Sequence, residues 1–596
     1  MILQELINLY DRLETSEDTE IWKLGFSPES IHYAIIIDRE GHFKGLDDYR
    51  TIGSDGKLHP SVFVVPKREG KRAGKANENS PYFLWDNSQF VLGVEVKNKK
   101  TKPKPQSHSF FVDKQKRILE ETKASNKDVT AVMKFLESGQ AKEKLLNSEE
   151  WKTAVEENLT GVNLSFIIED SENDGFVFEQ EEIKQIWRDY YAVVDQDVPQ
   201  RYCLVTGKKA PVYRLQPTIK KGVGNGGKND IPLISFNEKV FESYNLSGNE
   251  NAQINRFSAG KFTHALNYLT MENKHNLRIA DTLTLFWAEN NRSAEHFFSG
   301  LMDRPDTDDE ERRQELETFL KEMQKGKLPS DLADDSRFFV LGLAPNSARI
   351  SVRFWHTDTV SKMGKKVASH YQDLKIIPQN KEKDSLTPSI WQLLIETASQ
   401  HKSANIPPNI AGPVMRSILS GTRYPSNLLS ILIGRMRTDQ EYRRLNYYRV
   451  AFIKAILNRN FNKELTVALD ADRKTAPYSL GRLFAVLERT QEDASGGSLN
   501  ATIKDRYFAS ASATPRVVFP VIIKLAQNHL KKIKSTKPGL AVNKEKLIGE
   551  IMEDISDFPK SLKLEDQGEF AIGYYHQRQD FFKKKQKKIT ETEGEM

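Results

Sequence analysis

The chain has 596 residues, of which 38% are hydrophobic, 29% charged and 10% aromatic. This length exceeds what one compact core supports, and the aromatic content excludes global disorder, so we expect two or three folded domains. The 88 Lys and Arg residues and 82 Asp and Glu residues give a net charge of only +6, which does not by itself require a nucleic-acid partner.

The single cysteine, Cys203, excludes an internal disulfide and a four-cysteine zinc site, and it fits a reducing, cytoplasmic setting. No apolar run approaches the length of a membrane span, so no membrane partner is expected. The N-terminal segment lacks the basic region and cleavage site of a signal peptide. We predict instead an amphipathic helix whose apolar face consists of Leu3, Leu6, Ile7, Tyr10 and Leu13.

Up to about residue 360, strand-like and helix-like patterns alternate. Residues from about Lys114 to Glu156 have helical composition, whereas Lys97–Pro105 is rich in Lys and Pro and predicts an exposed loop. Short apolar runs predict strands at His32–Asp38, Ser61–Val65, Gln89–Val94, Leu164–Ile168, Tyr213–Leu215 and Leu233–Phe236.

The segment Phe338–Trp355 predicts two further strands around Pro345-Asn346. Its second run alternates with period two, which places Ile350, Val352 and Phe354 on one face and Arg349, Ser351 and Arg353 on the other.

Strand patterns fade beyond about residue 385, and four amphipathic segments near the C-terminus predict an antiparallel helical bundle, because each apolar stripe needs a partner. Asn543 is the expected N-cap of the third helix. The basic run Lys583–Lys588 and the acidic tail predict a frayed end. The four stripes are Leu480/Leu483/Phe484/Leu487, Phe519/Ile522/Ile523/Ala526/Leu530/Ile533, Ile548/Ile551/Met552/Ile555 and Phe570/Tyr574/Phe581.

The fold class predicted from these patterns is α+β (mixed) and multi-domain. A mixed α/β region over residues 1–360 is followed by a helical connecting region over 361–477 and a C-terminal helical bundle over 478–596.

The strongest local charge feature is Lys67–Asn79, called the basic loop below. Its glycines allow a ligand to approach the backbone closely, and its cations suit phosphate neutralisation by counterion release. The amides of Asn77 and Asn79 suit base edges in a groove. The alternative is a solvated surface loop. The candidate DNA-binding residues here are Lys67, Arg68, Lys71, Arg72, Lys75, Asn77 and Asn79.

Two further basic features have competing interpretations. Arg349 and Arg353 on one strand face suit DNA, although salt bridges to neighbouring acids are the simpler explanation. The segment 423–459 mixes arginines with Tyr442, Tyr447 and Tyr448, which suits single-stranded nucleic acid as well as half-buried helices.

Catalytic signatures are weak in this sequence. Gly222–Lys228 has the letters of a phosphate-binding loop, but Asn229 replaces the Ser or Thr that would hold magnesium, and Pro232 follows where a helix should begin. The twelve histidines form no evident dyad or metal motif. Asp38, at a strand end, is as compatible with a turn as with a metal site. We therefore expect no enzyme activity, no catalytic residues, no metal and no cofactor.

Several long segments together resemble the large subunit of the type I-C CRISPR surveillance complex, Cascade. No single segment encodes a chemistry, so the resemblance is collective. The segments are MILQELINLYDRL at the start, FLWDNSQFVLG (83–93), CLVTGKKAPVYRLQPTIKKGV (203–223), DTLTLFWA (281–288), Phe339–Trp355, LGRLFAVLERTQEDA (480–494), RYFASASATPRVVFP (506–520) and EDQGEFAIGYYHQRQ (565–579).

The resemblance implies a non-catalytic subunit whose N-terminal region recognises the protospacer-adjacent motif in double-stranded DNA, while guide RNA reads the remaining sequence by base pairing. It further implies stabilisation of the R-loop and displaced strand, and a docking surface for the helicase–nuclease effector. The implied partners are target double-stranded DNA, CRISPR RNA-bound backbone subunits, the small subunit and that effector.

Members of this family are thought to yield the small subunit from an internal start, which would cover the C-terminal bundle. Here no methionine lies between Met436 and Met552, so such a product would need a non-standard start, for example at Val467. Two alternatives to the DNA-binding role remain. One is a nucleotide-binding enzyme that uses Gly222–Lys228, and the other is a structural scaffold without direct DNA contact.

Overall fold

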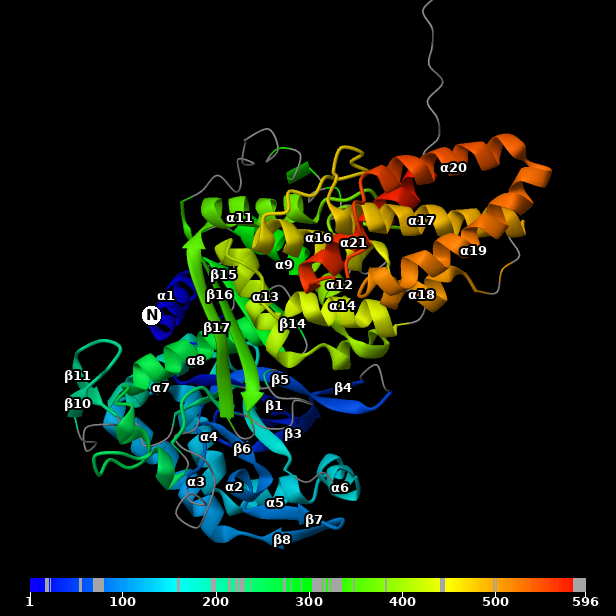
Figure 1. Ribbon diagram of the computed structural model, residues 1–596. Helices are drawn as coiled ribbons and strands as arrows, with labels where there is room; N and C mark the ends of the chain where they lie inside the picture. Colours follow the sequence, from blue (N-terminus) through cyan, green and yellow to red (C-terminus); the bar gives the residue numbers. More distant parts are fainter. Residues whose placement is uncertain are drawn as a thin grey trace, which may run out of the picture. The chain divides into compact units, whose positions relative to one another are not determined.

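In the computed structural model the chain divides into two compact units, one of Met1–Ile219 with Pro232–Tyr268 and the other of Lys220–Ile231 with Leu269–Met596 (Figure 1). None of the described helices is long and apolar enough to cross a membrane. The structure describes every residue except 17–20, 22, 53–55, 68–79, 158–160, 194–199, 213–215, 220–222, 224–230, 237, 272–274, 280, 291, 303–313, 315–317, 320–321, 323–334, 347–348, 381–382, 440–444, 497–498, 500 and 583–596.

The first unit contains a four-stranded mixed sheet in the order β3-β2-β9-β6, in which only β2 and β9 run parallel. The apolar runs of β2 and β9 are almost wholly buried, which confirms the strands predicted at His32–Asp38 and Leu164–Ile168. The strands are β2 (Tyr33–Ile37), β3 (Phe43–Asp48), β6 (Trp85–Asn87) and β9 (Asn163–Ile168).

A second, antiparallel sheet in the order β1-β5-β4 contains the strand predicted at Ser61–Val65. Three two-stranded sheets are also described, β7-β8, β10-β11 and β12-β13. The bounds are β1 (Phe26–Ile31), β4 (Arg50–Ile52), β5 (Leu58–Pro66), β7 (Val94–Lys97), β8 (Lys100–Pro103), β10 (Gln200–Tyr202), β11 (Lys209–Pro211), β12 (Thr218–Ile219) and β13 (Ile231–Pro232).

The predicted N-terminal helix is confirmed, and the helical composition of residues 114–156 resolves into four helices. Helix α4 packs on strands β2 and β9 of the mixed sheet. The bounds are α1 (Ile2–Thr15), α2 (Ser88–Val91), α3 (Pro105–Thr122), α4 (Lys127–Glu137), α5 (Gly139–Leu146), α6 (Glu149–Glu156), η2 (Val177–Glu179), α7 (Glu181–Val193), η3 (Lys239–Phe241), η4 (Gly248–Asn251) and α8 (Arg256–Met271).

Three predictions in this unit are wrong. Gln89–Val94 is not a strand, because the Asn87 side chain accepts the backbone N–H of Gln89 and caps the short helix α2. Lys97–Pro105 is exposed but not a loop, since most of it forms the β7-β8 hairpin. Leu233–Phe236 is irregular backbone, because the short strand before it ends at Pro232. The strand predicted at Tyr213–Leu215 lies outside the described residues.

The second unit opens with an antiparallel sheet in the order β14-β15-β16-β17, which confirms the strand pair predicted around Pro345-Asn346. The predicted alternation is wrong in part. A register shift opposite Gly342/Leu343 breaks the period, so Val352 is 46% exposed while Phe354 is buried. The bounds are β14 (Asn276–Ile279), β15 (Thr282–Ala288), β16 (Arg337–Asn346) and β17 (Arg349–Thr359).

The described residues after Thr359 contain helices and no strand, as predicted. The boundaries predicted at residues 360 and 477 remain a prediction. The bounds are α9 (Arg292–Met302), which precedes β16, then α11 (Val360–Leu374), α12 (Ile390–Leu394), η6 (Ile395–Thr397), η7 (Ser399–His401), η8 (Ser403–Asn405), α13 (Pro408–Ser420), α14 (Leu428–Thr438) and α16 (Tyr447–Phe461).

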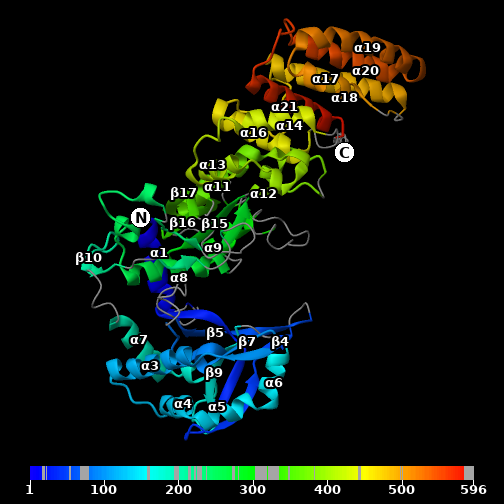
Figure 2. The ribbon, with the colours of Figure 1, turned by 90° about the horizontal axis from the view of Figure 1, so that it is seen from below.

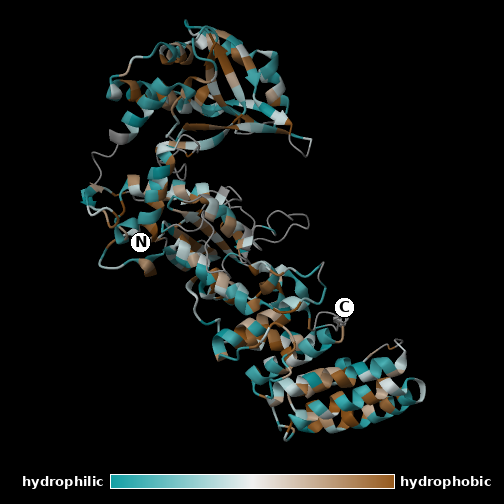
Figure 3. Ribbon diagram, turned by 90° about the horizontal axis from the view of Figure 1, so that it is seen from above, coloured by the Kyte–Doolittle hydropathy of each residue, from teal (hydrophilic) through white to brown (hydrophobic). Residues whose placement is uncertain are grey.

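The four predicted C-terminal helices are confirmed, and a fifth, α18, joins them (Figure 2). Hydrophobic and hydrophilic residues are interspersed along the helices of the C-terminal bundle (Figure 3). The N-cap predicted at Asn543 is wrong, because α20 begins at Pro538, and proline is well suited to the first turn. The bounds are α17 (Ala476–Ser495), α18 (Ile503–Ala511), α19 (Pro515–Thr536), α20 (Pro538–Glu553) and α21 (Leu564–Asp580).

Helices α17 and α21 approach each other closely through two glycines. A Cβ atom on Gly481 would lie 2.7 Å from the backbone nitrogen of Tyr574 and closer still to the carbonyl oxygen of Phe570. A Cβ on Gly573 would lie 3.0 Å from the carbonyl carbon of Tyr478. Only glycine allows this separation between the two backbones.

Candidate nucleic-acid interface

The basic loop leaves the core at the end of strand β5 and returns just before strand β6. The carbonyl oxygen of Pro66 accepts a hydrogen bond of 3.0 Å from the indole Nε1 of Trp85, which is buried. The backbone N–H of Lys67 donates to the carbonyl of Gly25 at 2.7 Å. The residues on the two sides of the loop are therefore held together against the core of the first unit.

The returning arm, Tyr82–Trp85, is fixed by its own contacts. The ring centroids of Tyr82 and Trp85 lie 3.9 Å apart. Leu84 has a left-handed backbone, φ 62°, which is costly for a branched side chain. Two buried hydrogen bonds of 2.9 Å hold it, one from its N–H to Gln115 and one from the Ser165 hydroxyl to its carbonyl.

These contacts fix the base of the basic loop. Lys67 is half-buried at that base. The remaining candidate residues, Arg68, Lys71, Arg72, Lys75, Asn77 and Asn79, lie outside the described residues, so their role in binding DNA stays a prediction.

Arg349 and Arg353 lie on strand β17 of the second unit, whereas the basic loop belongs to the first unit. Arg353 donates to the carboxylate of Asp281 at 2.8 Å, the kind of salt bridge considered as the alternative for this pair. Its side chain is still 43% exposed. Arg349 is half-buried at the start of the strand. Their proposed contact with DNA stays a prediction.

In the segment 423–459, the described arginines and tyrosines are mainly structural. Arg449 is fully buried and pairs with Asp439 at 2.7 Å and with Glu396 at 3.1 Å. Burial raises the pKa of Tyr447, and Tyr448 is half-buried, with its hydroxyl 3.3 Å from Gln392. Residues 440–444 lie outside the described part. The half-buried alternative therefore holds for these side chains.

Asp38 adopts the turn-forming role considered for it. Its carboxylate accepts the backbone N–H groups of Glu40 and His42 at 3.0 and 2.9 Å. Burial acts to raise the pKa of Asp38, but His42 and the ammonium of Lys44 outweigh it and lower the pKa to about 2. Within the described residues no group of His, Cys, Asp and Glu side chains could hold a metal ion. Of Gly222–Lys228, only Val223 is described.

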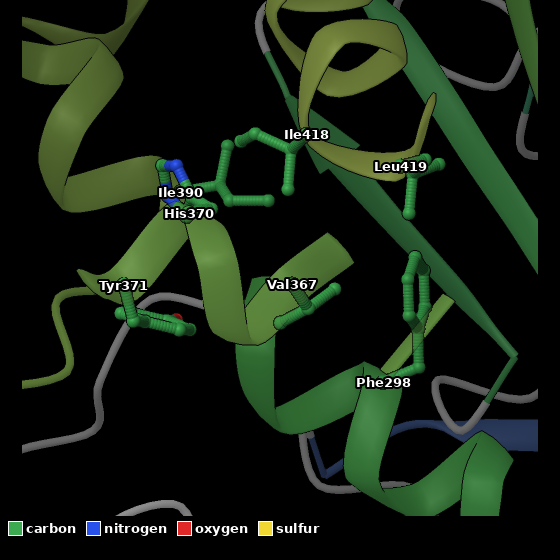
Figure 4. A pocket seen from close by; sticks show the side chains of 7 residues that line it. All are labelled: Phe298, Val367, His370, Tyr371, Ile390, Ile418 and Leu419. Carbon is green, nitrogen blue, oxygen red and sulfur yellow. The ribbon is translucent and has the colours of Figure 1, made fainter. Parts of the chain in front are cut away.

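A small cavity of about 10 Å³ in the second unit was not predicted from the sequence (Figure 4). The imidazole of His370 is the polar ring at its edge, and the described wall otherwise consists of aliphatic and aromatic side chains. The volume is marginal even for one water molecule. The lining residues are Phe298, Val367, His370, Tyr371, Ile390, Ile418 and Leu419.

The fold and these sites can be compared with known proteins. No curated protein sequence matches the chain. A family model described as CRISPR-associated protein (Cas_Csd1) matches residues 6–582, which is nearly the whole chain. The chain therefore belongs to the CRISPR-associated Csd1 family, the family of the large subunit of the type I-C Cascade.

Proposed function

We propose that this chain is the non-catalytic subunit of type I-C Cascade that recognises the protospacer-adjacent motif in double-stranded DNA. It then stabilises the R-loop and displaced strand and offers a docking surface to the helicase–nuclease. Its partners are the CRISPR RNA-bound backbone subunits and the small subunit. The family match over residues 6–582 carries the assignment to the complex.

The fixed base of the basic loop supports its choice as the motif reader. The hydrogen bond from buried Trp85 to Pro66 anchors this cationic segment to the core of the first unit. Lys and Arg side chains neutralise phosphates, and asparagine amides can pair with base edges. Binding energy alone then drives strand separation, while the guide RNA reads the sequence.

The test uses the assembled complex and duplexes that differ in the bases flanking the target. Changing Lys71, Arg72 and Lys75 to Glu should weaken binding to every duplex, and the slope of log affinity against log salt should fall by about 0.9 per lost phosphate contact. Changing Asn77 and Asn79 to Ala should reduce the preference among flanking sequences about 5- to 150-fold, with little change in the salt slope.

A matched control changes three exposed lysines of the same unit, Lys123, Lys127 and Lys144, to Glu. This control triple should leave the affinity unchanged. If the basic-loop variant also binds duplex as wild type does, the basic loop is not the motif reader, which is the result that the scaffold alternative predicts. ATP turnover that Lys228→Ala abolishes would instead establish the nucleotide-binding enzyme.

A further inference from the structure

Strands β7 and β8 form a short antiparallel hairpin, Val94–Pro103, called the lysine hairpin below (Figure 1). Its turn residues Asn98 and Lys99 have φ values of 54° and 56°. Positive φ at both central residues defines the type I′ turn, whose twist matches that of paired strands. The hairpin is therefore a defined ribbon rather than an irregular loop.

The register of this ribbon separates its two faces. Lys97 pairs with Lys100 and Glu95 pairs with Lys102, and directly opposed residues point to the same side of a sheet. The other face carries Val96, which is 4% exposed and belongs to the core of the first unit. The buried valine holds the ribbon in place, so the face with Glu95 and the three lysines points away from the core.

This outer face has a concentrated, uncompensated positive charge. Lys97, Lys100 and Lys102 are all exposed, and no described acidic side chain pairs with them. Glu95, the acidic residue on the same face, forms a salt bridge of 3.3 Å with Lys104. The opposed pair of Lys97 and Lys100 also places like charges side by side, which destabilises a hairpin. A ligand with closely spaced negative charges would remove that repulsion.

We infer that the outer face of the lysine hairpin binds the phosphate backbone of duplex DNA that flanks the target. A two-stranded ribbon fits the major groove of B-DNA. Lys100 and Lys102 stand about 6.8 Å apart along the strand, which is twice the ~3.4 Å spacing of charges along one DNA strand. Lysines act as point charges that position a duplex without reading its sequence.

Duplex is favoured over single-stranded nucleic acid because residues 94–104 contain no aromatic side chain on which unpaired bases could stack. The inference rests on the proposed function only in requiring that the complex meets duplex DNA. It concerns a different surface from the basic loop, and it predicts binding that does not depend on the flanking sequence.

The test changes Lys97, Lys100 and Lys102 to Glu in the assembled complex and measures affinity for motif-bearing and motif-free duplexes between 50 and 200 mM salt. Affinity should fall by the same factor on both duplexes. If all three lysines contact phosphates, the salt slope should fall by about 2.7, and the loss of affinity over this salt range should become about 40-fold smaller. The control triple in α4, α5 and the turn before α4 should match wild type.

The outcomes separate the two ideas. If wild-type complex shows no preference among flanking sequences, the proposed motif reader fails, whatever the hairpin does. If wild type binds duplex and the hairpin variant binds it equally at every salt concentration, the inference is overturned. Retained duplex affinity with loss of a protein subunit would show that the lysines bind protein, which also overturns it. A second variant, with Gln at the three positions, should give the same direction with a smaller shift while leaving assembly intact.

Discussion

The buried imidazole of His370 predicts a specific acid sensitivity of the second unit. Its Nδ1 lies 2.5 Å from the hydroxyl of Tyr424, and its Nε2 has no hydrogen-bond partner among the described residues. Burial, with a smaller effect of Arg459, lowers the pKa of His370 from 6.5 to about 3. Burial also raises the pKa of Tyr424, so this hydroxyl stays protonated and donates to the neutral ring.

The sign and size of the effect follow from proton linkage. Below pH 6.5 the unfolded chain binds a proton at His370, whereas the folded chain stays neutral there until about pH 3. The unfolded state therefore binds more protons, and stability falls as pH falls through this window. At about 1.4 kcal/mol per pH unit, the loss between pH 7 and pH 5 is about 2 kcal/mol.

The comparison is between wild type and His370→Asn, whose Oδ1 can accept from Tyr424 at the position of the ring Nδ1. The asparagine leaves a cavity, which lowers stability equally at every pH. Local unfolding free energies of α11 and α13 are measured by amide hydrogen exchange at pH 7, 6 and 5, corrected for intrinsic exchange. Other buried histidines titrate in both proteins, so the difference isolates His370. An equal pH dependence in the two proteins would refute the argument.

Two further predictions concern packing in the second unit. Gly481→Ala forces helix α17 away from α21 and should lower the free energy of unfolding by about 1–3 kcal/mol or more. Gly549 has open space around it, so Gly549→Ala should raise the free energy of unfolding by about 0.4–1 kcal/mol. Thermal unfolding that ranks the two variants in the opposite order contradicts this prediction. Arg449→Met removes the guanidinium from the buried carboxylate of Glu396 and from the partly buried carboxylate of Asp439, so hydrogen exchange in α14 and α16 should report a loss of about 3–5 kcal/mol. A loss below about 1 kcal/mol there would mean that the ion pair is not what stabilises this region.

Buried elements were predicted well from the sequence, because burial leaves a direct trace in residue type. The run from Tyr33 to Ile37 and the stripes of α17 and α19 need no knowledge of their neighbours to be recognised. The errors occur where a single hydrogen bond or turn determines whether a segment forms a helix, a strand or a loop. Apolar Phe90 and Val91 suit a strand, but the Asn87 cap turns them into a helix. The I′ turn at Asn98-Lys99 uses residues that also occur in open loops.

The residue composition of the candidate site was predictable from the sequence, but the tertiary contacts that hold it in place were not. The cluster of cations between residues 67 and 75 is visible in the sequence. Nothing in the sequence indicates that the indole of Trp85 reaches back across the loop to Pro66, because that contact joins residues 19 positions apart through tertiary packing. The same limit applies to Arg449, whose acidic partners lie ten and about fifty residues away and converted a basic–aromatic motif into a buried ion pair.

The hydrogen bond between Trp85 and Pro66 also bears on how this family could change its specificity. Because the two sides of the basic loop are joined below it, a change in loop length alters only the loop's own closure entropy, which grows by about 0.6 kcal/mol for each doubling. The core therefore places little selection on residues 68–79. Insertions, deletions and exchanges there can be sampled during evolution, or grafted by design, while the core keeps its stability. Under the proposed function, such changes would alter the recognised sequence.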